Sequence, residues 1–552
     1  GESKASNVTG NWTLLNTTTD PISRAKGITN TVRFISVNGT HVNSFYGPMI
    51  INFGGTLNLQ GRSLADSLVS RKPHLTIGVE MQAASAKESI FNNNGTINLQ
   101  RVSSKPAVSS SDDTLGIYLI GMTAMIEDYA QYQPTAGNVI SNRYSDVTYR
   151  PWASEMNNNG TINVNSIDSI GIDFSEFNFD PNAALGTNTS KRAAWGNKGS
   201  LNTYVKVGNI NVTSDDVNVG TSLAARGSYG IRVPNVFNGG STGKTVDTEG
   251  IYYNETIIDG KGGTIALEGS HNTGISISKI IGGSGYGNDT YSEYTMTPTL
   301  GAQSGTTYTV GQGNMSVYNY QTGVGANGTG LGGVGTTHGI DTAKTLDNTG
   351  RTANDLIGNI YNLNILVDGV ENVGFLRKSD YMSGSYSAAA LARAAGDFDI
   401  RDTHVNSIDF TSSADGGVLF RTDKYGINLL KNLTVTPGNA SAAAGRYNIV
   451  MMANGIYNPT VTTKVASTGD ITVSAGGQNV IGLMAYDGGV AEVAGNLTIT
   501  NSPTSIGLSI NGSNSSGVSS ATSSGNITIT GTDSVGIYNN GGNYTLTGGS
   551  IN

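Results

Sequence analysis

Two short phrases recur along this 552-residue chain, always in the same order, and this repeat limits the folds open to it. The first phrase alternates polar and apolar residues after a turn residue, as in Gly-Asn-Ile-Thr-Ile, and it occupies 469–473, 495–499 and 525–529. The second phrase, of the form Ile-Gly-Leu, follows these copies at 480–483, 505–508 and 534–538. Such self-similarity indicates a solenoid or another repeat architecture.

The same two phrases run through the upstream sequence at wider and less even spacing. Copies of the first phrase lie at 94–99, 159–164, 208–212, 263–267 and 358–360, with 55–59 as an earlier, solitary copy. Copies of the second phrase lie at 115–118, 169–172, 219–220, 229–231, 273–275 and 373–375. Because the order is kept while the spacing varies, we expect insertions between repeats.

Each phrase has the period of a β-strand. In 161–164, Ile162 and Val164 fall on one face, and Thr161 and Asn163 fall on the other. Asn-Gly corners bound the strands, because both residues tolerate the left-handed backbone of a sharp turn. Similar strands lie a whole repeat apart, so the economical solution stacks each phrase on its next copy and winds parallel sheets into a solenoid.

The predicted fold class is therefore all-β, a parallel β-helix with loop insertions and one short helix. A third strand per turn fits in the remaining residues, such as 489–493. Roughly twenty turns at ~4.8 Å each would make a rod on the order of 100 Å long. The helix is expected at 387–395, an Ala-rich segment that Gly396 would end. An antiparallel barrel or sandwich is the alternative, but it does not explain the fixed order of the phrases.

Four insertions interrupt the predicted solenoid, at about 101–156, 175–207, 278–356 and 377–425. Insertions in a solenoid map to surface loops, and aromatic side chains on such loops supply contact area at low entropic cost. The candidate binding residues are Tyr286, Tyr291, Tyr294, Tyr308, Tyr318, Tyr320, Trp195 and Trp152. For any single loop, a role in covering the sheet is an equally open interpretation.

The two ends of the chain differ from the repeat. Residues 1–50 lack a clean phrase and are predicted to form an N-terminal cap, since an open solenoid end exposes strand edges and core. Trp12, Phe34, Phe45 and Tyr46 are candidates for that plug. Residues 51–552 form the predicted β-helix, and we expect further turns to follow in the natural protein because the chain stops inside a repeat.

Composition narrows the possible partners. Charged residues make up 13% of the chain, the formal net charge is −8 and no basic stripe is present, so nucleic acid is not an expected partner. Cysteine is absent, which is common in bacterial exported proteins. No metal or cofactor is expected, because the five histidines form no metal-spaced pair and the glycine-rich runs at 239–245, 282–289 and 323–328 match nucleotide or calcium motifs only by letters.

An enzymatic interpretation remains as the minority alternative. A β-helix polysaccharide lyase or hydrolase needs carboxylates clustered on one face of adjoining turns. Asp112-Asp113 and Asp215-Asp216 are adjacent pairs, but neighbours in a strand point to opposite faces. Three aspartates near Arg401, at 397, 399 and 402, could bind a cation or cap a turn. A passive stalk spacer is the other alternative.

The phrases at 158–164 and 169–172, together with the absence of cysteine and the abundance of Asn and Gly, resemble the very large classical (type Va) autotransporter adhesins of fusobacteria, such as those of the RadD coaggregation type. The resemblance covers most of the chain as a style of repeat. It implies a right-handed β-helix passenger domain, exported by type V secretion through a C-terminal outer-membrane barrel that we do not expect in this sequence. No catalytic or ligand residue carries over, because the shared phrases are structural.

The expected function is that of a non-catalytic cell-surface adhesin and virulence factor. The resemblance implies attachment to other bacteria in coaggregation and biofilm, and to host cells, through protein or glycan receptors that include immune-cell receptors. The expected location is extracellular, on the bacterial surface and anchored in the outer membrane. A single-chain β-helix closes its own core, so a monomer is expected.

Overall fold

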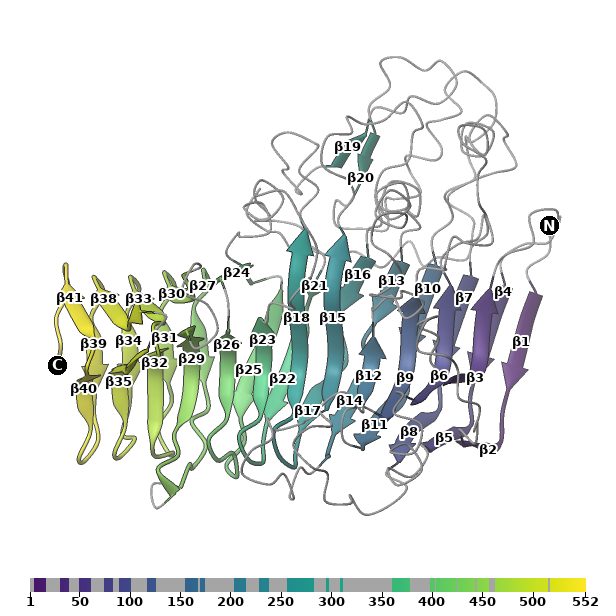
Figure 1. Cartoon of the computed structure of the whole chain (residues 1–552), viewed down its shortest axis with the longest axis horizontal. Coiled ribbons are helices and arrows are strands. Elements are labelled where there is room, and N and C mark those ends of the chain that lie inside the picture. Colours follow the sequence, from purple (N-terminus) through teal and green to yellow (C-terminus); the bar gives the residue numbers. More distant parts are fainter. Residues whose placement is uncertain are drawn as a thin grey trace.

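The computed structural model describes residues 4–15, 30–38, 49–60, 74–82, 89–100, 117–125, 154–166, 169–173, 203–214, 228–237, 256–281, 294–296, 308–310, 360–377, 398–402, 404–423, 425–441, 444–455, 462–514 and 517–552. These residues form a parallel β-helix with three strands per turn (Figure 1). Each turn is called a rung below, and rungs are numbered from the N-terminus.

Sheet A takes the first strand of rungs 1 to 7. Its strands, all parallel, are β1 (Lys4–Val8), β4 (Met49–Phe53), β7 (Ser89–Asn93), β10 (Ser154–Asn158), β13 (Thr203–Lys206), β16 (Thr256–Asp259) and β21 (Ile360–Tyr361). Sheet B takes the second strand of rungs 1 to 8. Its strands are β2 (Asn11–Leu15), β5 (Thr56–Gln60), β8 (Thr96–Gln100), β11 (Thr161–Asn165), β14 (Asn209–Val212), β17 (Ile265–Leu267), β22 (Leu363–Val367) and β25 (Val405–Phe410).

Sheet C runs the whole length of the rod and has twelve strands. They are β3 (Asn30–Asn38), β6 (His74–Gln82), β9 (Ile117–Met125), β12 (Ile170–Asp173), β15 (Tyr229–Phe237), β18 (Thr273–Ile281), β23 (Val373–Arg377), β26 (Val418–Thr422), β29 (Asn448–Asn454), β32 (Val480–Tyr486), β35 (Ile506–Asn511) and β40 (Val535–Asn540). At ~4.8 Å per rung, the stack is roughly 55 Å long.

Two further sheets replace A and B in the C-terminal rungs. Sheet D contains β24 (Phe398–Ile400), β27 (Gly426–Leu429), β30 (Lys464–Ser467), β33 (Val490–Val493), β38 (Ser520–Ser523) and β41 (Asn543–Leu546). Sheet E contains β28 (Leu433–Val435), β31 (Ile471–Val473), β34 (Leu497–Ile499) and β39 (Ile527–Ile529). Two antiparallel pairs stand apart from the stack. They are β19 (Tyr294–Met296) with β20 (Tyr308–Val310), and β36 (Ser513–Asn514) with β37 (Gly517–Val518).

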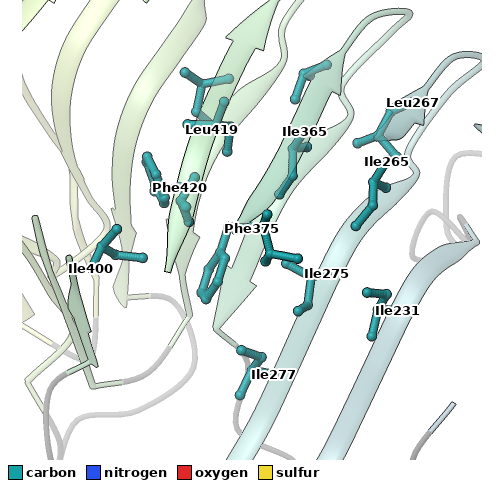
Figure 2. Packing of buried hydrophobic residues seen from close by; sticks show 14 of the residues in the cluster. Ile231, Ile265, Leu267, Ile275, Ile277, Ile365, Phe375, Ile400, Leu419 and Phe420 are labelled. Carbon is teal, nitrogen blue, oxygen red and sulfur yellow. The ribbon is translucent and has the colours of Figure 1, made fainter. Parts of the chain in front are cut away.

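The core is built by stacking like on like. In sheet B, Ile162 lies between Ile97 and Ile210, and all three side chains are fully buried. Figure 2 shows the same principle in the middle of the rod, where Ile231, Ile275, Phe375 and Phe420 follow one another along sheet C. The alternating strand pattern therefore places its apolar residues inside, as the sequence predicts.

The glycine of the second phrase occupies one register position of sheet C. A Cβ on Gly171 would lie 2.7 Å from the carbonyl oxygen of Gly230 and 3.0 Å from Cγ2 of Ile210, on the facing strand of sheet B. The same position holds glycine in nine of the twelve rungs, at 78, 121, 171, 230, 274, 374, 482, 507 and 536, and Phe34, Leu419 and Val450 in the others. The phrase thus marks where the backbone of sheet C lies close to side chains of sheet B, or of sheet E in the C-terminal rungs.

A seam crosses the rod where Leu419 and Val450 replace this glycine. Sheet A ends at β21 and sheet D begins at β24, while sheet B ends at β25 and sheet E begins at β28. Fully buried rings lie beside the break: Phe398 stacks on Phe375 at 5.3 Å between centroids and on His404 at 5.6 Å. Larger side chains therefore fill the core beside the break, and sheet C alone is continuous.

Several sequence predictions need correction. The copy of the second phrase predicted at 115–118 is wrong. Ile120 and Met122, five residues later than expected, pair with Ile170 and Ile172.

The first phrase of rung 7 is also not at 358–360, since Ile365 of β22 pairs with Ile265 instead. The copy at 55–59 is not solitary, because β4 and β6 complete its rung. The described stack has twelve complete rungs and the start of a thirteenth at β41, rather than about twenty, because long segments between strands inflate the residue count per turn.

Other predictions stand as follows. The third strand at 489–493 is confirmed as β33. Residues 4–8, 11–15 and 30–38 form β1, β2 and β3 of rung 1, and a capping role for this region stays a prediction. The predicted insertion at 377–425 includes three strands of the stack, β24, β25 and β26. The helix expected at 387–395 lies outside the described residues.

Candidate functional site

The longest segments between strands all leave the rod at one edge. This edge is the crossing from sheet C to the first strand of the next rung, and in Figure 1 it is the upper edge of the middle of the rod. Five consecutive rungs have long segments at this crossing: 126–153, 174–202, 238–255, 282–359 and 378–397. We call this crossing in rungs 3 to 7 the display edge.

The same crossing is short in the C-terminal rungs. Only residues 487–489 separate β32 from β33, and 541–542 separate β40 from β41. Three residues are thus enough for the backbone to pass from sheet C to sheet D, and residues 83–88 are enough to pass from sheet C to sheet A after β6. The long segments are not needed to close the solenoid, so stacking does not account for their presence.

A two-stranded extension supports the centre of the display edge. β12 ends at Asp173, which pairs with Arg232, whereas β15 and β18 continue and pair Asn235 with Lys279 and Phe237 with Ile281. Both strands reach beyond their neighbours in Figure 1. The segment 282–359 therefore starts from a strand that is longer than the stack requires.

Two of the predicted binding residues lie on one hairpin within that segment. β19 and β20 are antiparallel, with Tyr294 opposite Val310 and Met296 opposite Tyr308. Positions that are opposite or two apart in a hairpin share a face. Tyr294 and Tyr308 therefore belong to the same face, while positions 295 and 309 belong to the other.

The structure does not place the remaining candidates. Tyr286, Tyr291, Tyr318, Tyr320, Trp195 and Trp152 lie outside the described residues. Their positions in the sequence fall in segments of the display edge: 126–153 holds Trp152, 174–202 holds Trp195, and 282–359 holds the four tyrosines. Their role in binding stays a prediction.

A chain of charged side chains, which the sequence analysis missed, links rungs 6 to 9 at the corner that follows sheets B and E. His271 Nε2 lies 2.8 Å from Glu371 Oε2, Arg446 Nε donates to Glu371 Oε1 at 3.2 Å, and Arg446 also donates to Asp415 at 2.8 Å. The hydrogen bond to Asp415 is the main reason that the pKa of Arg446 is raised. No sequence motif joins residues so far apart, so only the register of the stack reveals them.

Two other charged groups near the seam have shifted pKa values. Burial lowers the pKa of Lys431, although the negative charge of Asp402, 3.9 Å away, acts to raise it. The Nζ of Lys431 also donates a hydrogen bond to the Val405 carbonyl at 2.7 Å. Burial acts to raise the pKa of Asp368, but hydrogen bonds from Thr411, Ser413 and the Gly369 amide outweigh it and lower the pKa. Asp402 thus contacts a lysine of the next rung, and the turn-capping interpretation of this aspartate stays a prediction.

Among the residues that the structure describes, no group of three or more His, Cys, Asp or Glu side chains could hold a metal ion. No helix within the described ranges has the length and apolar character to span a membrane. The chain matches no family model, and no curated protein or solved structure matches it. The arguments for function therefore rest on the geometry of the rod and its display edge.

Proposed function

We propose that this chain is a cell-surface adhesin that attaches a bacterium to other bacteria and to host cells. In this proposal the rod presents the segments of the display edge to protein or glycan receptors, including those of immune cells. The observation that carries the proposal is the placement of five long segments at one crossing of consecutive rungs, on a core that closes elsewhere with short crossings such as 83–88 and 487–489. A rigid scaffold with long segments on one side is a common arrangement for recognition.

The distribution of these segments along the rod supports a division of labour. Rungs 3 to 7 carry the long segments, whereas the crossings after β32 and β40 are tight. We infer that the C-terminal rungs act as a stalk and hold the display edge away from the bacterial surface. The resemblance to autotransporter passengers fits this order, because such passengers are anchored to the outer membrane beyond their C-terminal end.

The first test is binding of the labelled chain to partner bacteria and to host cells, with and without residues 282–359. A short Gly-Ser linker would join Ile281, which ends β18, to Ile360, which opens β21 in the adjoining rung. We expect saturable binding by the intact chain, loss of binding by the shortened chain and an unchanged β-sheet circular dichroism spectrum. Equal binding by both chains would move the site to another segment of the display edge, and no binding by either would favour the spacer.

A second test uses the two faces of the β19–β20 hairpin. We expect Tyr294→Ala with Tyr308→Ala to weaken binding at least tenfold, because truncating a central aromatic anchor typically costs ~2 kcal/mol or more. Thr295→Ala with Thr309→Ala is the matched control, since these positions share the opposite face. Equal affinity of the tyrosine variant and the control would remove the hairpin from the binding site.

A further inference from the structure

Sheet B carries an uncharged face of regular composition in rungs 2 to 5. Its outward residues are Thr56, Asn58, Gln60, Thr96, Asn98, Gln100, Thr161, Asn163, Asn165, Asn209, Asn211 and Thr213. We call this set the amide face. The alternating burial of these four strands places the twelve side chains outside and their apolar neighbours inside.

The carboxamides of the amide face form a ladder along the rod. Asn98 donates to Asn58, Asn163 donates to Asn98 and Asn211 donates to Asn163, each at 2.9 Å. Each carboxamide has two N–H donors, and the ladder uses one of them. The ladder thus fixes the side-chain amides at the ~4.8 Å spacing of the strands and leaves a second donor per rung to point away from the ladder.

The position of the amide face relative to the display edge is the second observation. The rod has three sides, and the long segments leave at the edge between sheets C and A, which is opposite to sheet B. A partner on sheet B would therefore leave the display edge accessible. The two surfaces can act independently.

We propose that the amide face is a self-association surface, on which a second copy of this chain docks face to face. The Asn, Gln and Thr side chains repeat at the spacing of the strands. A second sheet with the same spacing can therefore meet them with a matching side chain at every rung, as identical stacked strands do in paired sheets. A globular partner without this repeat would satisfy few of the aligned donors. The absence of charge on the amide face means that no desolvated ion is left unpaired when the two copies meet.

Charge beyond the amide face selects the relative direction of the two rods. The outward side of rungs 6, 7, 8 and 10 carries Glu268, Asp368, Asp409 and Asp470. Two parallel rods in register would set these carboxylates against one another. An antiparallel pair about a two-fold axis between β8 and β11 instead places Asn98 of one copy opposite Asn163 of the other, and the acidic rungs point away in opposite directions.

The area of the amide face implies that each contact is weak. Four strands of five residues cover about 300 Å² per copy, or about 600 Å² in total, which is below the ~1,200 Å² of a stable complex. Association of this kind becomes effective only when many copies act together on a surface. The chain in dilute solution is then a monomer, and surfaces coated with it adhere to one another.

The test is the clumping of beads coated with the full chain through a C-terminal tag. We expect beads with the natural sequence to clump, in high salt as in low salt, because an uncharged contact is not screened. Beads with Asn98→Lys and Asn163→Lys should stay dispersed, as should beads with Asn98→Asp and Asn163→Asp. A mixture of the lysine and aspartate beads should clump, because each introduced charge then faces its opposite.

The mixture of lysine and aspartate beads distinguishes loss of the contact from loss of folding, because misfolded variants would not clump when mixed. Thr472→Lys with Thr498→Lys, on the outward side of sheet E, adds the same charge elsewhere and should leave clumping unchanged. Natural beads that stay dispersed, variants that clump like the natural chain, or a mixture that stays dispersed would each overturn the proposal. Clumping that EDTA abolishes would also overturn it, since the contact would then run through cations on the acidic rungs.

The proposed adhesin function and the proposed self-association can be tested independently of each other. The chain that lacks residues 282–359 retains the whole amide face, so its beads should clump as the intact chain does. Loss of receptor binding with retained clumping supports both proposals. Loss of clumping in the shortened chain would place self-association at the display edge and contradict the inference.

Discussion

At the scale of single residues, the glycine in the second phrase is the most restrictive position of the fold. A Cβ on Gly171 would come within 2.7 Å of a backbone oxygen of the next rung, and the backbone there cannot move without disturbing the stack. We expect Gly171→Ala to lower the free energy of unfolding by about 1–3 kcal/mol, the usual range for overpacking a core.

The matched control for this prediction is Gly54→Ala. An added Cβ on Gly54 would meet Thr9 Cγ2 at 3.8 Å, which is an ordinary contact, and the backbone there is open to any residue. Urea denaturation followed by circular dichroism would compare the two variants. A Gly171 variant as stable as the Gly54 variant would mean that sheets B and C are not in such close contact.

This position also shows how far residues alone predict the structure. The Ile-Gly-Leu pattern correctly indicates a strand, but Ile117 and Tyr118 open β9 and pair with His74 and Leu75, ahead of the position that the phrase occupies in the other rungs. The true copy, around Ile120 and Met122, is chosen by pairing with the adjacent rungs, which a single strand does not encode. The phrase therefore predicts the element, and the stack determines its register.

At the scale of elements, the seam divides the rod into two blocks that share only sheet C. Hydrogen-bonded ladders break between β21 and β24 and between β25 and β28, while Phe398 packs beside the break. The seam is not marked by the repeated phrases, although β25 beside it departs from strict alternation and its pairing with β22 shifts register between Leu363 and Asn364. Its signal is the change from glycine to Leu419 and Val450, which is readable only once the register is known.

We expect Phe398→Ala to uncouple the two blocks. Removing a fully buried ring typically costs about 3–5 kcal/mol, and solenoid stability depends on contacts between neighbouring rungs. Thermal unfolding should therefore change from one transition to two, with early hydrogen exchange at β21 and β24. Phe91→Ala, which removes a buried ring inside unbroken sheet A, should lower the melting temperature without splitting the transition. A single transition in both variants would show that sheet C alone couples the blocks.

At the scale of the whole molecule, the rod behaves as a one-dimensional stack that tolerates interruption at one edge. Each rung contacts its neighbours above and below, so long segments at the display edge alter spacing in the sequence without altering the register of the core. The sequence therefore predicts the parallel β-helix correctly even though these segments interrupt the repeat. The candidate tyrosines and tryptophans are less predictable, because stacking does not constrain residues that leave the rod, and only Tyr294 and Tyr308 have a described position.

The one-dimensional character itself can be tested with Ile162→Asp. Ile162 is fully buried between Ile97 and Ile210, so an aspartate there would be an unpaired buried charge, and we expect a loss of several kcal/mol. Because coupling passes only through adjacent rungs, faster hydrogen exchange should be confined to the strands around β11 and should not reach β31 to β35. Uniform acceleration along the rod would contradict nearest-neighbour stacking. Unchanged exchange at β8 and β14 would mean that residue 162 faces outward, which would reverse the register of sheet B and turn the amide face into the core.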